Sequence, residues 1–533
     1  MPSMIRRAAV VLASLLPALA AAVPEGPTYP SAAWAAREAA NYAKVLEAPI
    51  EQVANPAFLA RLGTQSLLNT SDYLLRDLRD PSWVLVYTPT LAAAVAALGD
   101  GTPVLSTLNA VTALLRNDPS ASLRLPLGTP PALPLCASQA LQCAGDPYRW
   151  PSADAFYLLE ADVQPVVFYD SGCARLSGRV WKPRGLTVGR RLPGIVIQNG
   201  SVQAPETAYW WMAQALVRAG YTVLTFDPRG QGRSDFATPD LQQGTNINPS
   251  VFWTGLVDAI DFLRSRPAKP YPNEARCAGT YPTRTASVNP FHAALDLDRL
   301  GIVGHSLGAI GVSIVQGYGA PGADPWLGKI DSSNPVDVAV AWDGLISPAD
   351  GTPGGAGGVL FERLPGMLST AVIDGLLTRG EPRWQPRVPT MGQSSEYGIA
   401  PLPLTAPPDP EVHKTGFKAW QAAGIPSYEL TIRGSSHFEW SQIPTFPTTS
   451  WCPSTAGGRC SAGFGQPFAE HYTLAWLDRW LKRGGESGFV SADARLLDDA
   501  SWVDRTSFHY RSARSFTTRA GAVKVCEDVR AGC

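Results

Sequence analysis

The serine with the clearest chemical context in this chain is Ser306, in Gly304-His-Ser-Leu-Gly308. The short apolar run Leu300–Val303 precedes it, and the small-residue apolar stretch Ala309–Val315 follows it directly. This order predicts a strand, a sharp turn and a helix, the context in which a G-x-S-x-G serine stands exposed above a sheet edge. Both glycines are needed because side chains there would collide with the neighbouring strand and helix. The helix N-terminus behind the serine can stabilise negative charge, so we expect a nucleophile here.

A serine hydroxyl is a weak nucleophile until a base removes its proton. The chain has six histidines, and His437 has the position that fits a base. It follows the apolar run Tyr428–Ile432 through a flexible turn, which would put it at the C-terminal edge of the last parallel strand, where sites gather in open α/β sheets. His305 adjoins the serine, but the tight turn should point it away. We therefore expect His437 to be the general base.

Two carboxylates compete for the task of orienting this histidine and stabilising its cation. Glu396 follows the run Val388–Met391, and Asp343 follows the run before it, Val336–Ala341. Both fit the chain order serine, acid, histidine that is expected with such a serine turn. We favour Glu396, because its strand should lie beside the strand that carries His437. Asp343 stays open as the alternative.

The oxygen that becomes negative during attack on a carbonyl needs two backbone N–H donors. Leu307, directly after the serine, should supply one of them. The other should come from the loop after the apolar run Leu192–Gln198, where we choose Ser201, with Gly200 allowing a close approach. The pair Trp210–Trp211 follows closely and could line an acyl pocket or equally belong to the packed core.

The elements that must position these residues alternate along the chain. Apolar runs predict two antiparallel strands over Ala155–Tyr169 and Ala174–Trp181, and then strands over Leu192–Gln198, Tyr221–Phe226, Arg299–Val303, Val336–Ala341, Val388–Met391 and Tyr428–Ile432. Helices are expected over Glu206–Ala219, Val251–Arg266, His413–Ala423 and Phe468–Lys482. Such alternation predicts an α/β fold with a mostly parallel central sheet flanked by helices. The Gly- and Pro-rich stretch after Asp343 and the short helical pattern behind it predict a small cap insertion at about residues 344–387.

The N-terminal part has a different character. Arg6 and Arg7, the short apolar stretch Ala8–Leu19 and the small residues after it are typical of a secretory signal peptide over residues 1–22. Residues 23–150 should form a helical extension and a proline-rich linker, since Ser31–Ala43 has high helix propensity. The catalytic domain is expected over residues 151–533.

Net charge, apolar runs and cysteine content indicate the cellular compartment of the protein and the classes of partner that it could bind. The net charge of −1 without a basic block argues against nucleic-acid binding, and no later apolar run is long enough to span a bilayer. The eight cysteines fit an oxidising compartment, so we expect a secreted or periplasmic protein. Their spacing lacks the C-x₂-C pattern of metal sites. Proximity in the sequence predicts the disulfides Cys136–Cys143, Cys173–Cys277, Cys452–Cys460 and Cys526–Cys533.

Two stretches resemble the α/β-hydrolase superfamily. They are Leu216–Asp235, which contains Asp-Pro-Arg-Gly-Gln-Gly, and Gly301–Ala309, which contains the serine turn. The resemblance covers about residues 155–483 and implies the α/β-hydrolase fold with a Ser–acid–His triad, carried here onto Ser306, Glu396 and His437. The chain has Asn199-Gly where many members have His-Gly, and Glu in place of the commoner Asp.

We therefore expect a secreted serine hydrolase that cleaves carboxylic esters through an acyl-enzyme intermediate. The substrate should be a small-molecule or lipid-like ester, and no metal or organic cofactor is expected. An amidase, peptidase or lactonase with the same triad is the first alternative, because a fold does not fix a function. A non-catalytic binding protein on the same scaffold is the second, although such a protein would usually have lost the serine or the histidine.

Overall fold

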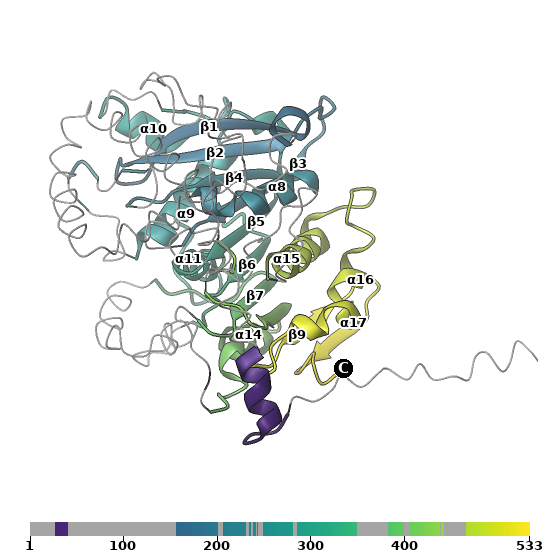
Figure 1. Cartoon of the computed structure of the whole chain (residues 1–533). Coiled ribbons are helices and arrows are strands. Elements are labelled where there is room, and N and C mark those ends of the chain that lie inside the picture. The colour runs from purple at the N-terminus through teal and green to yellow at the C-terminus, as the bar shows by residue number, and fades with distance from the viewer. Residues whose placement is uncertain are drawn as a thin grey trace, which may run out of the picture.

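A single ten-stranded sheet organises the computed structural model, with the strand order β1-β2-β4-β3-β5-β6-β7-β8-β9-β10 (Figure 1). The structure describes residues 27–40, 156–200, 206–230, 234–235, 238–240, 242, 249–280, 285–348, 382–398, 404, 406–437, 439–441 and 465–533. The strands are β1 Ala161–Tyr169, β2 Arg175–Pro183, β3 Leu192–Gln198, β4 Thr222–Phe226, β5 Leu295–His305, β6 Val338–Trp342, β7 Thr390–Ser395, β8 Ser427–Ile432, β9 Ala513–Thr517 and β10 Val523–Cys526.

The centre of the sheet is parallel, from β4 through β3, β5, β6 and β7 to β8. Antiparallel pairs close both edges, β1 with β2 on one side and β9 with β10 on the other. The mostly parallel sheet predicted from the sequence is therefore confirmed. One predicted strand is shorter than expected, because Phe156–Glu160 forms a π-helical turn and extended backbone begins only at Ala161.

Helices cover both faces of the sheet, as the alternating pattern predicted. They are α8 Trp210–Arg218, α9 Val251–Arg264, α10 Pro272–Cys277, α11 Leu307–Val315, α14 Thr415–Ala422, α15 Gly465–Leu481, α16 Ala492–Leu496 and α17 Asp499–Trp502. In β3, Ile195 and Ile197 pack into the cluster formed with α8 and α15, and Val196 packs into the cluster formed with α9 and α11. Successive side chains of a strand point to opposite faces, so a strand buried on both sides is continuously apolar.

The first described segment packs on the C-terminal part of the chain. The helix over residues 32–40, purple in Figure 1, belongs to the predicted N-terminal extension. Its Glu38 carboxylate accepts a hydrogen bond from the Leu404 N–H at 2.7 Å and lies 2.5 Å from the His509 imidazole. The predicted signal peptide, the rest of the extension, most of the predicted cap and the cysteine pairs Cys136–Cys143 and Cys452–Cys460 lie outside the described residues.

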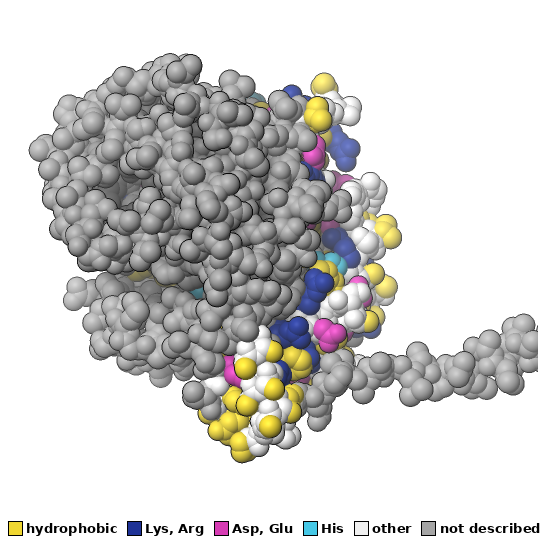
Figure 2. Space-filling view, in the orientation of Figure 1, with side chains coloured by type: hydrophobic (Ala, Val, Ile, Leu, Met, Phe, Trp, Pro, Cys, Tyr) yellow, Lys and Arg dark blue, Asp and Glu magenta, His cyan; other side chains and the backbone are white. Residues whose placement is uncertain are grey.

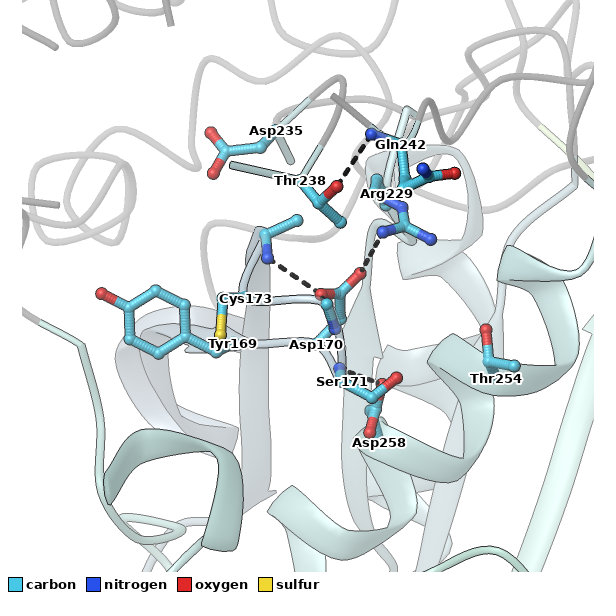
Figure 3. A network of polar contacts seen from close by, with 12 residues as sticks. Tyr169, Asp170, Ser171, Cys173, Arg229, Asp235, Thr238, Gln242, Thr254 and Asp258 are labelled. Atoms are coloured by element: carbon cyan, nitrogen blue, oxygen red, sulfur yellow. Dashed lines mark hydrogen bonds and ion pairs between the residues drawn. The ribbon is translucent and has the colours of Figure 1, made fainter. Parts of the chain in front are cut away.

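Two of the predicted disulfides are present, Cys173–Cys277 and Cys526–Cys533. The first joins the turn between β1 and β2 to α10. A network of buried polar groups holds the same turn (Figure 3): Asp170 pairs with Arg229 at 3.4 Å, and the Ser171 N–H donates to Asp258 on α9 at 2.7 Å. Disulfide and network together fix this turn on the sheet.

The described surface carries charge of both signs. In Figure 2 basic and acidic side chains are interspersed over the C-terminal segments, in keeping with a net charge of −1. Within the part of the chain that is described, no helix combines the length and the apolar character needed to cross a bilayer.

Candidate active site

Ser306 lies in a strained turn between β5 and α11. Its backbone has φ 58° and ψ −125°, a conformation that non-glycine residues rarely adopt and that clusters at functional sites. A Cβ on Gly304 would lie 2.4 Å from the Gly308 carbonyl oxygen, and a Cβ on Gly308 would lie 2.4 Å from that of Asn199. The steric reason inferred from the sequence for these two glycines is therefore confirmed.

Three side chains from three strand ends meet at this turn. The Ser306 Oγ lies 2.8 Å from His437 Nε2, and His437 Nδ1 lies 2.5 Å from Asp343 Oδ2. Their exposed fractions are 7, 5 and 4 %. A nucleophile bonded to a base, which is bonded in turn to an orienting acid, is the geometry that nucleophilic catalysis by serine requires.

His437 reaches this position through the turn that follows β8. Gly434 there has φ 68°, and the Ser435 hydroxyl donates to the Ile432 carbonyl at 2.6 Å. The His437 N–H donates to the Gly398 carbonyl at 2.8 Å, which ties the turn to the segment after β7. The structure thus brings His437 beside Ser306 at the edge that the sequence indicated.

Asp343 follows β6 and turns its carboxylate across the end of β7. Its φ of 51° is left-handed, and its N–H donates to the Gln393 carbonyl at 2.6 Å. The Ser395 N–H and hydroxyl donate to the two carboxylate oxygens at 2.8 and 2.7 Å. A Cβ on Gly344 would lie 2.7 Å from the Ser306 carbonyl oxygen, so glycine allows the close approach of the two turns.

The preference for Glu396 as the orienting acid needs correction. Glu396 follows the strand beside β8, as expected, but its carboxylate accepts hydrogen bonds from the Gly434 N–H and the Ser507 hydroxyl, both at 2.5 Å. Successive side chains at a strand end point to opposite sides. Ser395 therefore faces Asp343, and Glu396 faces away toward the C-terminal segment. Ser395 itself is a site residue that the sequence reasoning missed.

The expected oxyanion donors are only partly within the described residues. Leu307 is the first residue of α11, so its N–H has no carbonyl partner within the helix. Ser201 lies outside the described residues, and its role stays a prediction. The preceding residue, Gly200, lies close to Ser306, since a Cβ on it would lie 3.1 Å from Ser306 Cβ. Asn199 donates to Asp227 at 3.0 Å and so anchors this loop on the end of β4.

The two tryptophans considered for an acyl pocket belong to the core. Trp210 is fully buried with the Arg179 guanidinium stacked over its ring at 4.1 Å. The Trp211 indole donates to the Trp440 carbonyl at 3.1 Å. Of the two alternatives left open by the sequence, the core is correct.

The topology and the serine turn define the class of this protein. A parallel sheet with a nucleophile elbow after β5, an acid after β6 and a histidine after β8 is the arrangement of the α/β-hydrolase fold. A family model described as the alpha/beta hydrolase fold matches residues 195–315. The described part of the chain has the α/β-hydrolase fold, and this match supports the α/β-hydrolase superfamily.

Two known proteins are similar to parts of this chain. A protein named Hydrolase acrC from Aspergillus aculeatus is 29% identical over 150 residues, which make up 26% of this chain and 28% of that protein. An acylaminoacyl peptidase from Pyrococcus horikoshii, of known structure, has 12% identity and a TM-score of 0.37 over 63% of this chain and 45% of that one. This chain thus spans less than half of either relative.

Proposed function

We propose that this protein is a serine hydrolase that cleaves carboxylic esters of small or lipid-like molecules. The observation that carries the proposal is the unbroken series of contacts from Ser306 Oγ through His437 to Asp343, at 2.8 and 2.5 Å. The match of residues 195–315 to the alpha/beta hydrolase family model supports a hydrolase. The side chains in this series would fill the three roles that acyl transfer needs.

In the first half of the reaction, the ester carbonyl binds above Ser306. His437 Nε2 accepts the hydroxyl proton as Oγ attacks the carbonyl carbon, and Asp343 holds the ring and stabilises the imidazolium. The Leu307 N–H, with a donor from the loop after β3, binds the negative oxygen of the tetrahedral intermediate. The intermediate collapses as His437 returns its proton to the departing alcohol, which leaves an acyl group on Ser306.

In the second half, water takes the place of the alcohol. His437 removes its proton, the hydroxide attacks the acyl carbon, and the second tetrahedral intermediate releases the acid and regenerates the Ser306 hydroxyl. All proton transfers pass through one nitrogen, His437 Nε2. The same residues could also cleave an amide. An alcohol is a better leaving group than an amine, so the barrier to ester cleavage at this site should be lower.

A panel of p-nitrophenyl esters with rising acyl length tests the proposal. Wild type should hydrolyse at least one of them, and Ser306→Ala should lose about 10⁴-fold or more in kcat. The matched control is Ser313→Ala, also buried and on α11, whose hydroxyl donates to the Ala309 carbonyl at 2.9 Å. It should retain the wild-type rate. Equal turnover by wild type and Ser306→Ala would refute the proposal, and faster cleavage of matched p-nitroanilides would favour the amidase alternative.

We also propose that the protein is secreted. The N-terminal pattern of a signal peptide and the disulfides Cys173–Cys277 and Cys526–Cys533 support an oxidising destination. Expression with the native N-terminus should deliver active protein outside the cytoplasm, with a new N-terminus near Ala22 by mass spectrometry. Full-length protein retained in the cytoplasm would contradict this.

A further inference from the structure

A buried histidine that the proposed mechanism does not use lies directly beside Ser306. His305 is 1 % exposed, and both of its ring nitrogens have partners. Its Nδ1 lies 2.8 Å from the Tyr209 hydroxyl, and its Nε2 lies 2.7 Å from the His437 carbonyl oxygen. The Tyr209 hydroxyl in turn accepts a hydrogen bond from the Gly200 N–H at 3.0 Å. The loop after β3 and the turn that carries His437 are thus joined through two side chains.

The hydrogen bonds from Gly200 through Tyr209 and His305 to the His437 carbonyl form one series, and each hydrogen in it has a fixed place. A carbonyl oxygen can only accept, so His305 Nε2 must carry the hydrogen that it shares with His437. Burial, and the nearby His437 ring, lower the pKa of His305 to about 3, so the ring is neutral and Nδ1 is an acceptor. Tyr209 therefore donates to Nδ1, which leaves its oxygen to accept from Gly200. Every donor in the series meets an acceptor.

The two ends of the series both lie close to Ser306. At one end, Gly200 lies where even a Cβ would come within 3.1 Å of the Ser306 Cβ. At the other end, the held carbonyl belongs to His437, whose ring bonds to Ser306. A shift of about 1 Å between groups that act on the same reacting atom is enough to slow a reaction markedly.

We propose that Tyr209 and His305 are positioning residues that set the spacing between Gly200, at the start of the loop after β3, and the base His437. Neither touches the reacting atoms, and both act through the backbone groups that they hold. The proposal rests on the proposed function, since it concerns the rate of the reaction at Ser306. A merely structural role would affect stability alone, whereas a positioning role lowers kcat while KM changes little.

Tyr209→Phe removes the hydroxyl that bonds both the Gly200 N–H and His305 Nδ1, so each of these groups loses this hydrogen bond. We expect kcat for the best p-nitrophenyl ester to fall about 10- to 100-fold, as for a misplacement of reacting groups by up to about 1 Å, with KM nearly unchanged. The matched control is Tyr221→Phe. Tyr221 is also fully buried and donates its hydroxyl proton, to Asp478 at 2.7 Å. This control should lose thermal stability and keep its kcat.

Substitutions of His305 separate the two halves of the series. In His305→Gln the side-chain amide can still donate to the His437 carbonyl, and in His305→Asn the amide oxygen can stand in for Nδ1 toward Tyr209. We expect both variants to have a higher kcat than His305→Ala. The difference in kcat should be larger than their difference in thermal stability can explain.

The outcomes distinguish this inference from the proposed function. Wild type with Ser306-dependent turnover, together with a Tyr209→Phe kcat equal to that of Tyr221→Phe, would overturn the inference alone. Three His305 variants with equally low activity and equally low stability would also overturn it. Absence of Ser306-dependent turnover in wild type would overturn the proposed function and this inference with it.

Discussion

The carboxylate of Asp343 contacts the imidazole of His437 across an intervening strand. Asp343 follows β6 and His437 follows β8, and β7 lies between them in the sheet. The contact of 2.5 Å forms because the left-handed backbone at Asp343 turns the side chain over the end of β7, where Ser395 binds it. Glu396 follows β7, the strand next to β8, but its carboxylate bonds to Gly434 and Ser507 and not to His437.

This relationship predicts opposite outcomes for two conservative substitutions. Asp343→Asn keeps the size of the side chain but removes the charge that selects the His437 tautomer and stabilises its cation, so kcat should fall by about 10³- to 10⁴-fold. Glu396→Gln should keep most of its kcat, because its partners are Gly434 and Ser507. Steady-state kinetics on one ester measures both. A collapse in Glu396→Gln with an active Asp343→Asn would reverse our assignment.

Ser395 should matter through the acid that it binds. Ser395→Ala removes the hydroxyl donor to Asp343 and leaves the backbone donor in place. Loss of one hydrogen bond to this charged group should lower kcat about tenfold. Ser394 is the internal control, since its hydroxyl donates to Glu429 at 2.6 Å, away from Asp343. If Ser394→Ala and Ser395→Ala have the same kcat, the hydroxyl has no part in orienting the acid.

The packing of the serine turn predicts a stability difference between two glycine substitutions. Gly308→Ala would set a methyl group 2.4 Å from the Asn199 carbonyl oxygen, and the clash should lower the free energy of unfolding by about 1–3 kcal/mol. Gly255→Ala on α9 meets its nearest atom at 3.6 Å and should be neutral or stabilising by up to about 1 kcal/mol. Denaturant unfolding of both variants compares the two sites. Similar stabilities would show that the serine turn tolerates a side chain.

The polar network in Figure 3 predicts a dependence of stability on pH. Burial, and then the charge of Asp170, raise the pKa of Asp258 to about 7, above its value of about 3.9 in an unfolded chain. The native state therefore keeps a proton that the unfolded state loses. The stability contributed by this group is complete below pH 4 and is lost as the pH rises through 7.

Comparison with Asp258→Asn isolates this effect, because every other titrating group is retained. The substitution also disturbs the bonds to Ser171 and Asn273, which gives an offset at all pH values. The test is therefore how the stability difference between Asp258→Asn and wild type changes with pH. Asp258→Asn should gain stability relative to wild type between pH 4 and pH 7 in thermal unfolding, and a constant offset would show that Asp258 is ionised in the native state throughout.

Local patterns were enough to predict the elements that carry the proposed nucleophile and the proposed base. Leu192–Gln198 was predicted to the residue as β3, because a strand buried on both faces is a continuous apolar run with clear ends. Ser306 and His437 follow from such runs by motif and by position. The acid could not be derived in this way. Which carboxylate meets His437 depends on the φ angle at Asp343 and on which of Ser395 and Glu396 points toward Asp343. A shift of one residue along a strand moves a side chain to the opposite face of the sheet.

The C-terminal edge of the sheet was missed for a different reason. β9 and β10 are short, and Val523 and Val525 in β10 are 69 and 55 % exposed. β9 has only five residues, two of them the polar Arg514 and Ser515, and β10 is an exposed edge strand of four, so neither shows the regular apolar alternation that marks a strand in sequence. His305 and Tyr209 were missed as partners because no pattern in the sequence links residues 96 positions apart.

Reaction with a fluorophosphonate probe, followed by intact mass and peptide mapping, tests the assignment of Ser306 as nucleophile most directly. The probe reacts with an activated serine and mimics the tetrahedral intermediate. We predict one adduct per chain, on Ser306, with none in Ser306→Ala and much slower formation in Asp343→Asn than in Glu396→Gln. An adduct on another residue, equal labelling of Ser306→Ala, or no labelling of wild type would contradict the assignment.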